Sequence, residues 1–295
     1  MNTTQTAEQL KEIVKEKYGQ IADQSYEQNA TSCCGAGCGC STTTDYVVMA
    51  DDYSKLKGYV AEADLGLGCG LPTEFALIKE GDTVIDLGSG AGNDAFVARS
   101  IAGEKGKVIG VDMTEKMITK ARSHADKLGY NNVEFRLGDI EELPVAANVA
   151  DVIVSNCVLN LVPDKAKAFT ETFRVLKPGG HFSVSDIVLR GELPEGLRKS
   201  SEMYAGCVAG AISKKDYLEI IEQAGFVHAK VQKEKMITVP DEIAAAHLSK
   251  DEFIKFKSGE SGIYSITVYA EKPVLTTEEK QAQKAACCGA ESTCC

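Results

Sequence analysis

The chain has 295 residues, of which 44% are hydrophobic and 25% charged, so its length allows one large domain or one and a half. A net charge of −11 without any run of lysine or arginine disfavours nucleic acids and anionic membranes as partners. The most apolar stretch, residues 150–162, is too short to span a bilayer, and residues 1–9 lack the apolar core of a signal peptide. We therefore expect a cytoplasmic protein.

The N-terminal part combines one helix with a cysteine-rich loop. Residues 7–18 place Leu10, Ile13, Val14 and Tyr18 on one face, which predicts a short amphipathic helix. Residues 32–44 consist almost entirely of glycine, serine, threonine and cysteine and cannot build a core, so we expect a loop there. It carries four cysteines: Cys33, Cys34, Cys38 and Cys40. The turn-rich stretch 65–72 follows and holds Cys69.

Strands and helices alternate through the next part of the chain. This rhythm predicts a parallel sheet with helices on both faces, an α/β architecture. The Lys-Pro-Gly-Gly sequence of residues 177–180 is expected to end the helix over 164–176, before the strand that begins at residue 181. The predicted strands are residues 83–87, 107–112, 133–137, 151–156 and 181–188, and the predicted helices are 93–101, 115–128 with Thr114 as N-cap, and 164–176.

The pattern changes after Arg190. Helices are predicted over 195–209 and 214–224 and a strand over 227–237, within a cap or insertion of about residues 191–261 near the carboxyl edge of the sheet, and a final strand is predicted over 262–270. A charged tail follows and ends in a second cysteine cluster, formed by Cys287, Cys288, Cys294 and Cys295. The expected organisation is an N-terminal helix and cysteine-rich loop (1–72), a cofactor-binding domain (73–190), a cap with the final strands (191–272) and a flexible tail (273–295).

The first strand breaks into the glycine-rich turn Asp86-Leu-Gly-Ser-Gly-Ala-Gly. In open α/β sheets ligands bind at the carboxyl ends of the strands, and glycine lets them approach the backbone. The spacing Gly-x-Gly-x-Gly differs from the Gly-x-Gly-x-x-Gly of dinucleotide-binding folds. Asp112 ends the second strand, where it can bond ribose hydroxyls, and Asp139 with Ile140 closes the third, where they suit adenine. The alternatives are a helix cap for Asp112, a turn for Asp139 and tight packing for the glycines.

Taken as a set, these motifs resemble those of the class I S-adenosylmethionine-dependent methyltransferases, over roughly residues 75–190. The resemblance implies a Rossmann-like sheet that binds S-adenosylmethionine through its methionine part, ribose and adenine. The implied cofactor-binding residues are Asp86, Gly88, Ser89, Gly90, Gly92, Asp112, Met113, Asp139, Ile140 and Asn156, the last on the floor of the site.

The methyl acceptor is indicated by cysteines rather than histidines. His124, His181, His228 and His247 are expected to be surface or structural residues, with His124 facing solvent. Three cysteines lie in the body of the chain on separate predicted elements: Cys69, Cys157 and Cys207. Cys157 or Cys207 alone could be a small buried core residue, whereas Cys69, between glycines, is less easily explained by packing. Three thiols around one opening would instead suit a soft, thiophilic centre such as trivalent arsenic, which has its own lone pair and needs no general base.

Over nearly its whole length the sequence resembles the arsenite S-adenosylmethionine methyltransferases. The matching stretches are residues 14–19, 62–70, 86–92, 155–161 and 204–207. The resemblance implies that Cys157 and Cys207 hold trivalent arsenic, with Cys69 as a third sulfur ligand or as a disulfide-exchange partner. It also implies an N-terminal cysteine, for which Cys34 competes with Cys33, Cys38 and Cys40.

The implied substrates are arsenite–thiol complexes and the implied reductant is glutathione or thioredoxin. Two other functions stay open at this point. One is methylation of a small organic acceptor such as a quinone precursor, with the cysteines as packing. The other is non-enzymatic, a thiol-rich arsenic- or metal-binding protein. Zinc is a weaker interpretation of the terminal clusters, which lack paired Cys-x-x-Cys spacing and nearby histidines.

Overall fold

The computed structural model describes residues 6–23, 51–192, 194, 208, 210–238, 241, 248–258 and 261–274. Several predictions from the sequence lie outside these residues. They are the loop over 32–44 with its four cysteines, nearly all of the helix over 195–209 including Cys207, His247, and the cysteine-rich tail. Among the described residues, no helix is both long and apolar enough to cross a bilayer.

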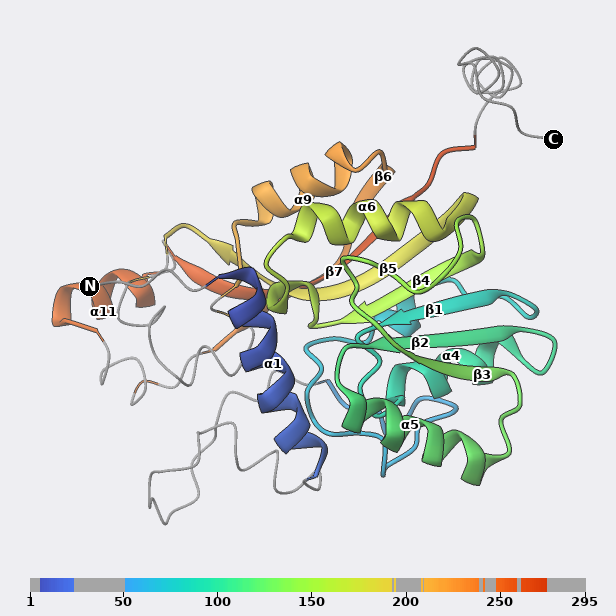
Figure 1. Ribbon diagram of the computed structural model, residues 1–295. Helices are drawn as coiled ribbons and strands as arrows, with labels where there is room; N and C mark the ends of the chain where they lie inside the picture. Colours follow the sequence, from blue (N-terminus) through green and yellow to red (C-terminus); the bar gives the residue numbers. More distant parts are fainter. Residues whose placement is uncertain are drawn as a thin grey trace.

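The described chain is organised around one sheet of seven strands in the order β3-β2-β1-β4-β5-β7-β6 (Figure 1). The first five of these pair in parallel, whereas β7 pairs antiparallel with β5 and β6. The strands are β1 (Thr83–Leu87), β2 (Lys107–Asp112), β3 (Val133–Leu137), β4 (Ala150–Asn156), β5 (Leu176–Arg190), β6 (Val227–Ile237) and β7 (Gly262–Glu271).

Helices cover both faces of this sheet. Helices α4 and α5 lie on one face and α6 and α9 on the other, while α1 crosses the end of the sheet where the parallel strands finish (Figure 1). The helices are α1 (Ala7–Ala22), α3 (Pro72–Phe75), α4 (Asn93–Ala102), α5 (Glu115–Leu128), α6 (Lys165–Val175), α9 (Lys214–Gln223) and α11 (Lys250–Lys257), with a 3-10 turn η1 (Leu159–Leu161).

Alternation of side chains along the strands explains the two layers. In β1, Val84 packs with the residues of α4 and α5, whereas its neighbour Ile85 packs with those of α6 and α9. Both are fully buried, as expected for a parallel strand covered on both sides. Since β1 leads on to β2 and β3 while β4 and β5 lie on its other side, the strand order reverses between β1 and β4. Ligands of open α/β sheets bind at such a point.

Two predicted elements have different bounds in the structure. The α1 helix extends to Ala22, and Ile13, which was expected on its buried face, is 38% exposed. Strand β5 begins at Leu176 instead of residue 181. Leu176 pairs with Ala150, and the register then shifts before His181 pairs with Val152. The predicted stop at residues 177–180 is therefore a bulge, with Gly179 at φ +83°, and not a break in the strand.

The C-terminal part belongs to the same sheet. Helix α9 packs against α6, and β7 lies between β5 and β6. Strand β6, which was expected within a cap or insertion, therefore forms the antiparallel edge of the sheet beside β7. The domain boundaries at residues 72, 190 and 272 stay predictions.

Candidate functional site: a pocket and a thiol pair

A pocket lies at the carboxyl ends of the parallel strands, at the reversal point between β1 and β4. It is lined by all but one of the residues that the sequence assigned to the cofactor, namely Asp86, Gly88, Ser89, Gly90, Asp112, Met113, Asp139, Ile140 and Asn156. Gly92 does not line it. A Cβ on Gly92 would lie 2.8 Å from the Phe96 ring and 2.9 Å from that of Phe135, which is the packing role left open above.

The glycine turn is shaped by the backbone and by one carboxylate. Gly88 and Gly90 have φ of +68° and +50°, where side chains are strained. A Cβ on Gly90 would meet nothing within 4 Å, so this backbone faces open space in the pocket. Asp112 accepts hydrogen bonds from the Gly90 amide at 3.0 Å and the Thr114 amide at 2.8 Å. Asp112 therefore ties the turn to the start of α5, and burial raises its pKa.

Three buried polar atoms beside the turn have no hydrogen-bond partner among the described residues: Asp86 Oδ2, Ser89 Oγ and Asn93 Oδ1. All three residues line the pocket. Burial, and then the charges of Asp94 and Asp112, raise the pKa of Asp86 well above its ordinary value. Because buried polar groups are nearly always satisfied, this part of the pocket suits a polar, positively charged ligand.

The opposite end of the pocket is closed by α1. Lys11 Nζ lies 2.6 Å from Asp139 Oδ2 and 2.6 Å from Glu141 Oε2. One turn and two turns further along the helix, Val14 and Tyr18 line the pocket. Asp139 also accepts the Glu141 amide at 2.8 Å, so it is both a turn residue and an anchor for the helix. The sequence does not distinguish Lys11 from the other lysines of this helix, so its role in the site was not predicted.

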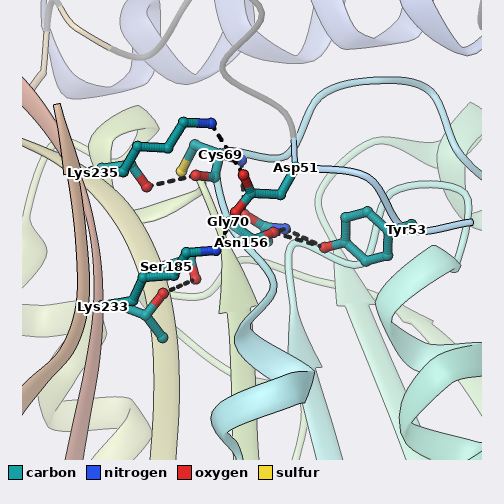
Figure 2. Close-up of polar contacts among 10 residues, drawn as sticks. Asp51, Tyr53, Cys69, Gly70, Asn156, Ser185, Lys233 and Lys235 are labelled. Atoms are coloured by element: carbon teal, nitrogen blue, oxygen red, sulfur yellow. Dashed lines mark hydrogen bonds and ion pairs between the residues drawn. The ribbon is translucent and has the colours of Figure 1, made fainter. Parts of the chain in front are cut away.

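A buried polar network joins the pocket to the segment that carries Cys69. The Asn156 amide nitrogen donates to Gly70 O at 2.8 Å and to the Tyr53 hydroxyl at 2.5 Å, while its oxygen accepts the Cys69 amide at 3.0 Å (Figure 2). Tyr53 in turn donates to Asp94 at 2.9 Å. Burial raises the pKa of Asp94 to about 6, although Tyr53 and Asn156 oppose the shift. Tyr53 was also missed, because its partners are distant in sequence.

The same segment is anchored at its start by an ion-pair cluster. Asp51 lies 2.7 Å from Lys233 Nζ and 3.0 Å from Lys235 Nζ, both on β6 (Figure 2). Although burial acts the other way, the two lysines lower the pKa of Asp51. Residues 51–70 are thus fixed to β6 at one end and to Asn156 at the other.

The sulfur atoms of Cys69 and Cys157 and a carboxylate oxygen of Asp186 all lie within 4.8 Å of one another. All three residues are buried, and both cysteines are present as thiols. Cys157 also lines the pocket, so the thiol pair adjoins the cofactor end of the site. The structure thus brings together two of the three body cysteines, which come from a loop and from the end of β4.

The backbone around each thiol is fixed. Cys69 O accepts a hydrogen bond from Ser265 Oγ at 2.5 Å. Cys157 has φ +61°, uncommon for a residue with a side chain, and its amide donates to Ser185 O at 2.8 Å. Cys207 lies outside the described residues, but Val208, the next residue, is buried in the apolar cluster that contains Cys69 and Cys157.

Asp186 is a buried carboxylate that sequence reasoning missed. Its Oδ1 accepts hydrogen bonds from Asn160 Nδ2 at 2.8 Å and from the Ile187 amide at 2.9 Å, and the Tyr217 hydroxyl lies 3.3 Å from Oδ2. Burial raises the pKa of Asp186 to about 7. The sequence does carry a sign of this residue, because Asp186 is a charged side chain within a strand whose other residues are typical of a buried strand.

The histidines described by the structure are outside this chemistry. His124 was expected to face solvent, which is wrong: it is 7% exposed, and its Nδ1 lies 3.2 Å from Ala91 O. The reason is that the glycine turn at Ala91 and the ring of Phe96 on α4 pack against this side chain. His181 contacts Ala76 O at 2.6 Å, and His228 is an exposed partner of Glu271 on the edge strand.

Comparison with known proteins identifies the family to which the chain that carries this pocket and thiol pair belongs. Residues 78–225, about half of the chain, match the family described as a methyltransferase domain. The arsenite methyltransferase of Halobacterium salinarum is 43% identical over 231 residues, covering 74% of this chain and 58% of that relative. The chain therefore spans less than two thirds of that protein's length.

Two further relatives match over more of their length. The arsenite methyltransferase of Aquipseudomonas alcaligenes is 33% identical over 251 residues, covering 83% of this chain and 70% of the relative. The crystal structure of an arsenic (III) S-adenosylmethionine methyltransferase from Chlamydomonas reinhardtii aligns with a TM-score of 0.59 at 36% identity, covering 77% of this chain and 72% of that one. The Rossmann-like fold expected from the sequence is confirmed. The chain belongs to the methyltransferase domain family and, within it, to the arsenite methyltransferases.

Proposed function

We propose that this protein methylates trivalent arsenic with S-adenosylmethionine, and that cysteine thiolates hold the arsenic. The observation that carries the proposal is the pairing of Cys69 with Cys157 beside the pocket. The names of the arsenite methyltransferases to which the chain is similar support the same activity.

The pocket residues fit S-adenosylmethionine. The unpartnered Asp86 Oδ2 and Ser89 Oγ suit the positively charged methionine part, and the open backbone at Gly90 allows close approach. Asp112 and Met113 suit the ribose, and Ile140 the adenine ring. When bound, S-adenosylmethionine supplies an electrophilic methyl group on a sulfonium.

The thiols capture and orient the acceptor. Cys69 and Cys157 displace small thiols or hydroxide from arsenic, and each thiol proton leaves with the displaced group. Cys207 supplies a third sulfur ligand, and Cys34 is the proposed N-terminal cysteine that takes part in arsenic binding. The fixed backbone around Cys69 and Cys157 aims the arsenic lone pair at the pocket, and orientation of this kind lowers the barrier to in-line transfer.

Transfer of the methyl group as a cation leaves arsenic formally pentavalent. Return to the trivalent state takes two electrons, which two arsenic-bound cysteine thiolates including Cys69 supply as their bonds to arsenic break and a disulfide forms between them. A small thiol such as glutathione, or thioredoxin, then reduces that disulfide by thiol exchange. The proposed substrates are therefore arsenite–thiol complexes, and the proposed partner is a thiol reductant.

The test is a methylation assay with purified full-length protein, S-adenosylmethionine, glutathione and arsenite, in which methylated arsenic and S-adenosylhomocysteine are measured. We expect Cys157→Ser and Cys207→Ser to abolish methylation while binding of S-adenosylmethionine is kept. Deletion of residues 287–295 is the matched control and should lower arsenic capture but leave turnover.

Each of the other candidate functions has its own signature in this assay. Full activity in either serine variant would contradict the assignment of the thiols. Arsenic binding without any S-adenosylhomocysteine would indicate a non-enzymatic arsenic-binding protein. Cofactor turnover with an organic acceptor but no stimulation by arsenite would indicate a different methyltransferase.

A further inference from the structure

Asp186 has no part in holding arsenic, yet it lies against both thiols. Thiolates are the ligands that soft centres prefer, whereas a carboxylate suits harder cations. Zinc accepts both: cysteine sulfur at about 2.3 Å and carboxylate oxygen at about 2.0–2.2 Å, in tetrahedral geometry. Two thiols and one carboxylate therefore form a mixed donor set that fits a divalent cation better than it fits trivalent arsenic.

The three donor atoms are already near the required spacing. They lie within 4.8 Å of one another. A tetrahedral zinc site with the bond lengths above places its ligand atoms roughly 3.5 Å apart.

Hydrogen bonds hold the carboxylate in a suitable orientation. Asp186 Oδ1 accepts hydrogen bonds from Asn160 and the Ile187 amide, whereas Oδ2 accepts one long hydrogen bond from the described residues, donated by the Tyr217 hydroxyl at 3.3 Å. Outer hydrogen bonds of this kind orient metal-binding carboxylates and raise metal affinity. Oδ2 is therefore the oxygen available to a cation.

Burial and access favour the same conclusion. The two cysteines lie in an apolar cluster with Ile187 and Leu189, where a buried charge is costly unless it is paired. A cation compensates the charge of Asp186 and of two thiolates together. Cys157 lines the pocket, so a cation can reach the three donor atoms from that side.

We propose that Cys69, Cys157 and Asp186 form a binding site for a divalent thiophilic cation such as Zn²⁺. The cation occupies the two thiols, so it competes with arsenite; this consequence, unlike cation binding itself, rests on the proposed function. Asp186 distinguishes the two ligands, because it contacts the divalent cation and not the arsenic.

The test uses the full chain with Cys207 and the eight terminal cysteines replaced by serine, since those thiols could bind zinc themselves. The replaced terminal residues are Cys33, Cys34, Cys38, Cys40, Cys287, Cys288, Cys294 and Cys295. Zn²⁺ affinity is measured by competition with a chromophoric chelator, and the ligands are identified by zinc X-ray absorption. We expect one zinc per chain, with two sulfur ligands and the remaining ligands oxygen.

Asp186→Asn is the decisive variant because it is isosteric and keeps the oxygen that accepts from Asn160 and Ile187. It should weaken Zn²⁺ binding by at least the ~10-fold typical of disturbing a metal site. Trivalent arsenic binding should weaken much less. Asp216→Asn, an exposed aspartate in the first turn of α9, is the matched control and should leave Zn²⁺ affinity as it was.

Unchanged Zn²⁺ affinity in Asp186→Asn would overturn the proposal, as would the absence of zinc binding. If Asp186→Asn does not fold, as judged by circular dichroism, Cys69→Ser and Cys157→Ser must each remove one sulfur from the zinc spectrum. Zinc binding by this ligand set without any arsenic methylation by the parent protein would contradict the proposed function alone.

Discussion

Asn156 connects the two halves of the site at the scale of a single side chain. Its amide nitrogen reaches Tyr53 and Gly70, its oxygen reaches the Cys69 amide, and its side chain lines the pocket. A Cβ on Gly68 would lie 2.6 Å from this amide, so glycine is what lets the loop approach so closely. The position of Cys69 therefore depends on polar contacts that lie outside the thiol pair.

Replacing Tyr53 by phenylalanine tests this network. The change removes the donor to the buried Asp94 carboxylate and the acceptor of Asn156. We expect the free energy of unfolding, measured by urea titration at neutral pH, to fall by about 1.5–3 kcal/mol. Tyr269→Phe is the control: that hydroxyl donates to Glu271 in a partly exposed pair, and its loss should cost less than about 0.5 kcal/mol. Equal losses in the two variants would show that the buried network has no special weight.

Asp94→Asn tests the pH dependence of the same network. Burial raises the pKa of Asp94 to about 6, against about 3.9 in an unfolded chain. The folded state therefore holds this proton more tightly, so the stability that the group contributes is complete below about pH 4 and is lost as the pH rises through about 6.

In urea titrations at several pH values without cofactor, the stability of Asp94→Asn relative to the parent should rise from pH 4 to 6. This difference in the free energy of unfolding should change by at most about 1.4 kcal/mol per pH unit, and above about pH 7 it should no longer change with pH. A stability difference that is independent of pH would contradict the raised pKa.

Helix α1 acts at the scale of an element. Its N-terminus is capped by Thr6 and Gln9 in a capping box, and its inner face presents Val14 and Tyr18 to the pocket. Lys11 is the ionic link between this helix and the turn after β3, through Asp139 and Glu141. We therefore expect the fit of the pocket around the adenine end to depend on the position of the helix.

Lys11→Ala should weaken binding of S-adenosylmethionine, measured by calorimetry, by roughly 1 kcal/mol or about fivefold in Kd. The loss follows from release of α1 rather than from any contact of Lys11 with the cofactor. Lys15→Ala is the matched control, because Lys15 pairs with Glu12 on the same helix. An unchanged or tighter Kd in Lys11→Ala would show that α1 does not hold the pocket closed.

At the scale of the whole molecule, three distant parts of the chain meet at one edge of the sheet. The parallel strands supply the pocket and Cys157, the segment 51–70 supplies Cys69, and the antiparallel edge strands anchor that segment through Ser265, Lys233 and Lys235. Arsenic bound between Cys69 and Cys157 would join these parts covalently.

Arsenite should therefore raise the thermal stability of the parent protein. At 100 times its Kd, a ligand specific to the folded state adds about 2.7 kcal/mol, which corresponds to a rise in Tm of roughly 5–10 °C. Cys157→Ser should show little of this rise, because the variant lacks one thiol of the pair. Arsenic that binds the folded and the unfolded chain equally well does not change Tm. A similar Tm rise in both proteins, measured by scanning calorimetry, would place the stabilising arsenic site elsewhere.

The sequence by itself determined the parallel sheet, the glycine turn and the residues that line the pocket. These features follow from local patterns: buried strands are continuous apolar runs, and Asp112, Asp139 and Asn156 come directly at or after strand ends. Resemblance at several short motifs gave the family, which the comparisons confirm.

The contacts that join the pocket to α1, to the segment 51–70 and to the thiol pair are evident only from the tertiary structure. Lys11, Tyr53 and Asp186 have partners 128, 41 and 26 residues away, and no local period relates such positions. Strand β6 was expected within a cap because its place at the edge of the sheet depends on pairing with β7, which the local sequence pattern does not specify. His124 was predicted to face solvent, and this prediction is wrong. The amphipathic pattern of one helix does not show which other segments of the chain pack over it.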